Sequence, residues 1–130
     1  MSEIFQDEHV TATLADGLLH LAWARDVSDD AKGIALAQQL TAALGRAVHG
    51  QKPSSIAMLV DLMAIRKAAP KANAVFLEWL RRDWRVFRVT AFASSNILLR
   101  SSLKVASLIP GINVNGFATV EEARAFLARS

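Results

Sequence analysis

The chain has 130 residues, of which 52% are hydrophobic and 21% charged, with a formal net charge of +3 at pH 7. This size and composition are typical of one globular domain over residues 1–130, and they exclude a disordered chain. The chain contains no cysteine, which excludes thiol catalysis, thiolate metal sites and disulfide bonds. No uncharged apolar run approaches the ~20 residues of a membrane span, and the acidic N-terminus does not resemble a secretory signal. We therefore expect a cytoplasmic protein without a transmembrane segment.

Charge is distributed unevenly along the chain. Residues 1–30 contain seven acidic residues and one arginine, a net charge of −6, whereas the remaining hundred contain fourteen basic and five acidic residues, a net charge of +9. An interaction surface produces such an asymmetry, and so do two oppositely charged faces of a soluble domain. The sequence leaves both interpretations open.

The N-terminal segment predicts a β-hairpin. Residues 9–14 and 19–23 each alternate between apolar and polar side chains. Asp16 and Gly17 lie between the two runs, and glycine tolerates the positive φ that a type I′ turn requires. His20 lies in the opposite phase to Leu19 and Leu21, so its side chain is expected to face solvent.

Helices and strands then alternate to the end of the chain. The predicted helices are residues 28–48, a helix that begins at Pro70, residues 97–109 and residues 119–127, the last opened by the Thr119/Glu122 capping box. The predicted strands between them are the continuous apolar run 56–60, residues 86–93 and a short strand around Phe117. This order predicts an α/β fold, in which the hairpin continues into a mixed sheet of about five strands with four helices.

Three stretches of the sequence resemble the SpoIIAA-like family, whose members are related to the STAS domain of anti-sigma-factor antagonists. They are Asp61-Leu62 at the end of an apolar strand, Leu80–Trp84 leading into Val86–Val89, and Ile97–Leu108 leading through Pro110-Gly111 into Val114–Phe126. The resemblance covers nearly the whole chain and implies a small STAS-like module without enzymatic activity.

The resemblance also implies where a regulatory switch would lie. In STAS antagonists, a serine or threonine at the start of the helix after the third strand is phosphorylated. The matching region here is Asp61–Pro70, and no serine or threonine occurs between Ser55 and Thr90. We therefore expect a regulatory module that contacts another protein, a second copy of the chain included, without this phosphorylation switch. STAS-like and Sec14-like domains are often discussed together, which makes a lipid-like ligand the alternative.

Candidate ligand-binding residues follow two strands and continue along the third predicted helix. They are Asp61, Arg66, Ser95, Asn96, Leu99 and Leu103. Ligands of open α/β sheets bind at the carboxyl ends of strands, and helix N-termini attract anionic groups. The helix 97–109 is apolar around most of its circumference and would border an apolar groove. Capping of local amides, and burial of this helix against the sheet or a dimer mate, explain the same residues.

A second candidate surface is basic and aromatic. It comprises Trp79, Trp84, Arg85 and Arg88. Cations beside aromatic rings can hold phosphates and bases. However, Trp79 also belongs to the apolar stripe of its helix, so we expect a protein contact here and no nucleic acid.

No motif in the sequence indicates catalysis, a cofactor or a metal. The three histidines His9, His20 and His49 lack the spacing of a metal site. A G-x-S-x-G nucleophile elbow and glycine-rich phosphate loops are also missing. The sequence thus predicts no enzyme, no cofactor and no metal centre.

Overall fold

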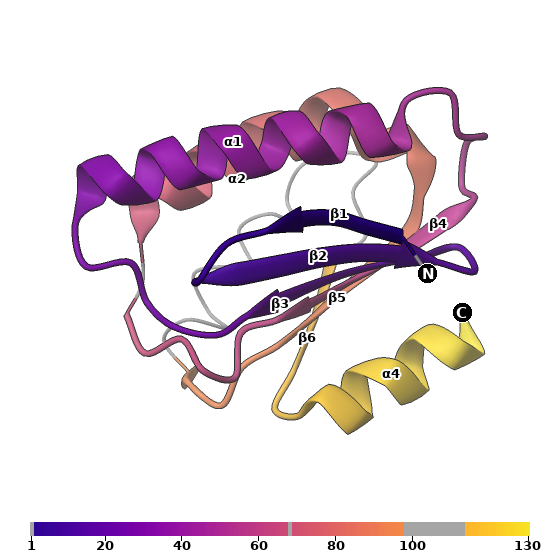
Figure 1. Cartoon of the computed structure of the whole chain (residues 1–130). Helices are drawn as coiled ribbons and strands as arrows, with labels where there is room; N and C mark the ends of the chain where they lie inside the picture. The colour runs from indigo at the N-terminus through magenta and orange to yellow at the C-terminus, as the bar shows by residue number, and fades with distance from the viewer. Residues whose placement is uncertain (1, 68, 98–113) are drawn as a thin grey trace.

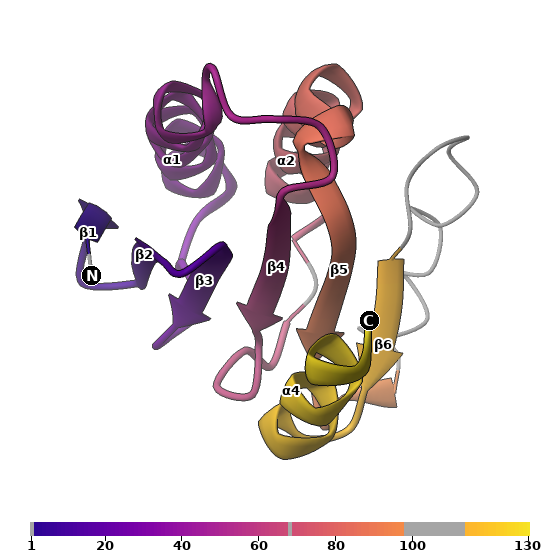
Figure 2. The ribbon, with the colours of Figure 1, turned by 90° about the vertical axis from the view of Figure 1, so that its right-hand side faces the viewer.

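The computed structural model describes residues 2–67, 69–97 and 114–130. These residues form a six-stranded mixed sheet in the order β1-β2-β3-β4-β5-β6, with helices on both faces (Figures 1 and 2). The strands are β1 (Ser2–Gln6), β2 (Val10–Ala15), β3 (Leu18–Trp23), β4 (Ile56–Asp61), β5 (Phe87–Ala93) and β6 (Val114–Phe117). The helices are α1 (Asp30–Val48), α2 (Pro70–Asp83), the short 3-10 helix η1 (Trp84–Val86) and α4 (Val120–Arg129). Strands β1 to β3 are antiparallel, and β3 to β6 are parallel.

The prediction of about five strands was one strand short. The additional strand is β1, which pairs with β2 at one edge of the sheet. Its register shifts between Glu3 and Phe5, so the segment lacks the strict alternation by which strands are recognised. The described residues hold three α-helices. The fourth predicted helix, 97–109, lies outside them except for Ile97.

The structure confirms the predicted hairpin. Asp16 and Gly17 have φ values of 52° and 77°, the positive values that a type I′ turn needs at both positions. β2 and β3 then pair without a shift from Val10↔Trp23 to Ala15↔Leu18. Because this register is continuous, Leu19 and Leu21 are fully buried on one face of the sheet and His20 lies on the other.

Side-chain caps begin α1 and α4 at the residues that the sequence predicts. Asp29 accepts a hydrogen bond from the Lys32 amide at 3.1 Å, and Thr119 Oγ1 accepts one from the Glu122 amide at 3.2 Å. These bonds satisfy amides that the first helical turn leaves unpaired. None of the helices in the described ranges is long and apolar enough to cross a membrane.

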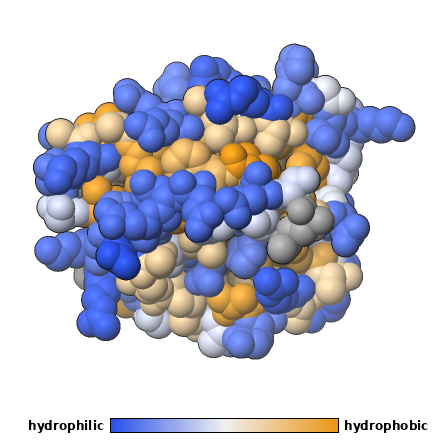
Figure 3. All heavy atoms as spheres, viewed as in Figure 1, coloured by the Kyte–Doolittle hydropathy of each residue, from blue (hydrophilic) through white to orange (hydrophobic). Residues whose placement is uncertain are grey.

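The sheet has one large apolar layer and one smaller layer. α1 and α2 lie side by side over one face, where Leu40, Met58 and Trp79 belong to the larger core (Figure 2). At the edge of this layer, Ile4 and Phe5 of β1 pack against the core, and an apolar band crosses the molecule at this level (Figure 3). α4 packs against the other face, over β4, β5 and β6. β4 is consequently covered on both sides, as its continuous apolar run predicts.

Candidate functional site

Two loops meet at the carboxyl ends of β4 and β5. Both begin with a side chain that accepts a hydrogen bond from a backbone amide two residues later. Asp61 Oδ1 accepts from the Met63 amide at 3.0 Å, and Ser94 Oγ accepts from the Asn96 amide at 3.1 Å. These are the turns that Asp and Ser favour after a strand. The Asp61 carboxylate therefore shapes the loop after β4.

Hydrogen bonds hold these two loops against each other. The Asn96 side-chain amide donates to the Arg66 carbonyl at 3.1 Å, and the Leu62 amide donates to the Ala93 carbonyl at 2.8 Å. Ser95 lies exposed between the partners Ser94 and Asn96. The structure thus brings Asp61, Arg66, Ser95 and Asn96 to one edge of the sheet. The other two candidates, Leu99 and Leu103, lie outside the described residues.

Asp26 anchors the same edge, and sequence reasoning missed it. It lies between β3 and α1, and its carboxylate accepts from the Arg66 amide at 3.2 Å and from the Lys67 amide at 3.3 Å. Asp26 and Arg66 are 40 residues apart. No local pattern signals such a contact, because the sheet topology alone brings the two loops together.

Removal of the Asp26 carboxylate is expected to loosen this edge. In Asp26→Ala the amides of Arg66 and Lys67 lose their acceptor, and we expect their hydrogen exchange to become about tenfold faster or more, because 1.4 kcal/mol of local stability corresponds to a factor of ten. Asp26→Asn keeps one acceptor oxygen and should give a smaller increase. NMR-detected exchange measures both. Unchanged exchange at Arg66 and Lys67 in Asp26→Ala would contradict the anchoring role.

An exposed apolar side chain follows each of the two strands, one in the loop after β4 and one at a helical residue after β5. Among the described residues, the exposed large hydrophobic side chains are Met63, with 37% of its surface accessible, and Ile97, with 67%. Arg66 and Lys67 are also exposed. We call Met63, Arg66, Lys67, Asn96 and Ile97 the carboxyl-edge surface. It combines two apolar side chains and two cations on two segments that are joined by the Asn96–Arg66 hydrogen bond.

One member of the second predicted surface, Trp79, is buried and cannot belong to a contact surface. Trp79 is only 1% exposed, and its ring lies 5.4 Å from that of Phe76 and 5.7 Å from that of Phe87. It is a core residue and presents no surface to a partner, which corrects its assignment to the contact surface. Trp84 is partly buried, and the Arg85 guanidinium lies 5.6 Å from its ring centroid.

Arg88, the last member of that predicted surface, is exposed on β5. Its Nη1 atom donates to the Ser130 carbonyl at 2.9 Å. This bond joins β5 to the end of α4, so Arg88 contributes to the attachment of that helix.

Comparisons with known proteins identify the fold. No model of a known protein family matches the sequence, and no curated protein matches it. The solved structure of an uncharacterised protein of the DUF3478 family from Shewanella loihica PV-4, described as having a SpoIIAA-like fold, matches over 91% of both chains. The TM-score is 0.66 and the sequence identity is 18%. The fold is SpoIIAA-like.

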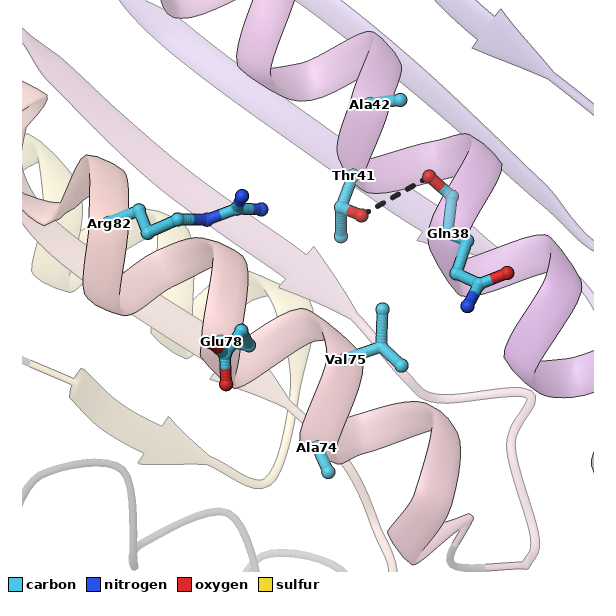
Figure 4. Close-up of a pocket in the computed structure, with 7 residues that line it drawn as sticks. All are labelled: Gln38, Thr41, Ala42, Ala74, Val75, Glu78 and Arg82. Atoms are coloured by element: carbon cyan, nitrogen blue, oxygen red, sulfur yellow. Dashed lines mark hydrogen bonds between the residues drawn. The ribbon is translucent and has the colours of Figure 1, made fainter.

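This SpoIIAA-like domain has two shallow hollows along the outer seam between α1 and α2. Their volumes are about 570 and 370 Å³. Figure 4 shows the larger one, with Arg82 extending from α2 toward Thr41 of α1. Glu78 and Asp83 accompany the cations Arg46 and Arg82 in these hollows. Among the described lining residues these charges balance, and none of them is a predicted ligand-binding residue.

The prediction that the His20 side chain faces solvent is also corrected, because the side chain is only partly exposed. It lies on the predicted face of β3, but that face is partly covered, and its Nε2 atom is buried without a hydrogen-bond partner in the described residues. Burial lowers the pKa of His20, Arg124 lowers it further, and Asp61 opposes the shift. Within the described ranges, no three His, Asp or Glu side chains gather as a metal site.

Proposed function

We propose that this SpoIIAA-like domain is a non-catalytic module that binds another protein through the carboxyl-edge surface. The observation that supports the proposal is the exposure of Met63 in the loop after β4 and of the helical residue Ile97 after β5, on segments tied together by the Asn96–Arg66 hydrogen bond. Contiguous exposed apolar patches are typical of interaction sites, and the Asn96–Arg66 bond brings the segments that carry these two side chains next to each other.

The anchored backbone of the loops favours binding. Asp26 holds the amides of Arg66 and Lys67, and Asp61 holds the amide of Met63. Loops ordered before association lose less conformational entropy when a partner binds. Binding without a large rearrangement is therefore expected at this edge.

The side chains define the chemistry of the partner. Methionine adapts its shape to different apolar surfaces, and interfaces commonly have an apolar centre with a polar rim. Arg66 and Lys67 supply positive charge at this rim. The partner we propose therefore presents an apolar patch bordered by acidic residues. The loop after β4 offers no serine or threonine, so binding at this loop does not depend on its phosphorylation.

A matched pair of variants tests the proposal. Met63→Asp places a negative charge on the carboxyl-edge surface, whereas Ala35→Asp places the same charge on an exposed position of α1. Cross-linking in extracts of the source cells identifies proteins retained by the wild type, and the purified partner is then titrated by calorimetry. We expect Met63→Asp to weaken binding about tenfold or more, and Ala35→Asp to leave it unchanged.

Two outcomes would overturn the proposal. The first is a partner that binds Met63→Asp and Ile97→Asp as tightly as the wild type. The second is native mass spectrometry that finds the purified protein carrying a lipid-sized adduct, with no protein lost selectively in Met63→Asp. This result would favour the alternative, an apolar or amphipathic ligand beside residues 97–109. Self-association abolished by Met63→Asp would identify the partner as a second copy.

A further inference from the structure

His20 lies at the border between the covered and the uncovered part of the sheet. It pairs with Thr13 of β2 on one side and with Leu59 of β4 on the other. Leu59 belongs to the apolar cluster on which Ala123 and Leu127 of α4 pack. The imidazole therefore stands beside the docked helix.

The surroundings of His20 suit a neutral ring. Its Nε2 atom is buried and has no hydrogen-bond partner in the described residues. A protonated imidazole donates from both nitrogens, so a proton on Nε2 would be buried without an acceptor while α4 is docked. Such an unpaired charged donor is costly.

In the part of the chain that the structure describes, the charged groups that act on His20 come from two elements. Arg124 of α4 disfavours a second positive charge, and Asp61 at the end of β4 favours it. Asp61 acts more weakly than burial and Arg124, and its Oδ1 atom already accepts from the Met63 amide. The flanking residues Thr13 and Leu59 carry no charge. Protonation thus opposes the docked arrangement.

α4 depends on this docking for its stability. It has ten residues, and isolated helices of that length are marginal in water. Within the described residues, its attachment comprises a small apolar cluster, the Phe117–Phe126 ring contact at 5.1 Å and the bond between Arg88 and Ser130. Elements held by few contacts open at a lower free energy than the core.

We propose that His20 is a pH-sensitive latch for α4, in which protonation of the imidazole favours a state with α4 displaced from the sheet. In the displaced state Nε2 reaches water, and Arg124 no longer stands beside it. The neutral ring is favoured in the docked state, so docking is strongest above the ordinary pKa of histidine, about 6.5. It weakens as the pH falls below this value toward the lowered pKa of the docked state, and it changes no further below that. Displacement also uncovers the apolar face formed by Leu59, Ala91 and Ala93.

Hydrogen exchange of the full chain tests the latch. Protection factors of the α4 amides, corrected for intrinsic exchange, are compared with those of β4 between pH 8 and pH 5. We expect the ratio of α4 to β4 protection factors to fall by at least about twofold on acidification in the wild type. The same fall is expected in His49→Asn, which removes an exposed histidine at the end of α1. It should be absent in His20→Asn.

A second variant keeps the test informative if His20→Asn alters the packing of the sheet. Arg124 is exposed, so Arg124→Gln removes its charge without touching the core, and the fall in α4 protection should become smaller. A fall of equal size in His20→Asn and the wild type would overturn the latch. A constant α4-to-β4 ratio in the wild type across this pH range would overturn it as well.

Discussion

Replacement of Trp79 by alanine is expected to lower the free energy of unfolding by about 3–5 kcal/mol. The side chain is 1% exposed and packs between Phe76 of α2 and Phe87 at the start of β5. Its removal leaves a cavity beneath the helix layer. Because domains of this size are stable by only about 5–15 kcal/mol, the variant should approach the threshold of unfolding. Urea denaturation followed by circular dichroism measures the change.

Two matched variants separate packing from the polar atom of the ring. Trp79→Phe keeps much of the apolar volume and removes Nε1, which is buried without a partner in the described residues. An unpaired buried donor costs about 1–3 kcal/mol, so we expect Trp79→Phe to lose less than half as much stability as Trp79→Ala. Trp84→Ala should also lose less than half as much stability as Trp79→Ala, because Trp84 is only partly buried. A loss in Trp84→Ala as large as that in Trp79→Ala would contradict the assignment of Trp79 to the core.

Local patterns predicted the elements well where the structure follows its regular geometry. Alternation around Asp16 and Gly17 predicted the hairpin, and the capping residues Asp29 and Thr119 marked the starts of α1 and α4. β1 was missed because the register shift after Glu3 breaks its alternation. The patterns therefore fail where the backbone departs from a regular period.

The candidate site was predictable only in part. The rule that loops at the carboxyl ends of parallel strands meet at one edge placed Asp61 and Asn96 together. The contact of Asp26 with Arg66 and the burial of the His20 Nε2 atom follow from tertiary packing. A single sequence carries no local signal for either. The same holds for the exposure of Met63, because an apolar residue in a loop reads equally well as a core contact.

A methyl group added at Gly116 is expected to destabilise the protein by about 1–3 kcal/mol. Gly116 of β6 lies opposite Phe92 of β5, and a Cβ atom there would stand 2.7 Å from Cζ and 2.9 Å from Cε2 of the Phe92 ring. Phe92 is 3% exposed and belongs to the core between the sheet and the helices. The ring cannot move aside without displacing its neighbours. Gly116→Ala should therefore lower the urea midpoint without changing the slope of the transition.

Gly33 provides the matched control, because the same change is expected to have the opposite sign there. Gly33 lies inside α1, and an added Cβ would meet the Ala72 Cβ at 3.7 Å, an ordinary contact. Alanine in a helix interior is favoured over glycine by about 0.5–1 kcal/mol, so Gly33→Ala should raise the midpoint. Phe92→Leu replaces the ring that obstructs Gly116 with a smaller side chain. In this background Gly116→Ala should lower the free energy of unfolding by less. A Gly116→Ala penalty that persists unchanged with Phe92→Leu would show that backbone conformation, and not the close approach of the ring, requires glycine at this position.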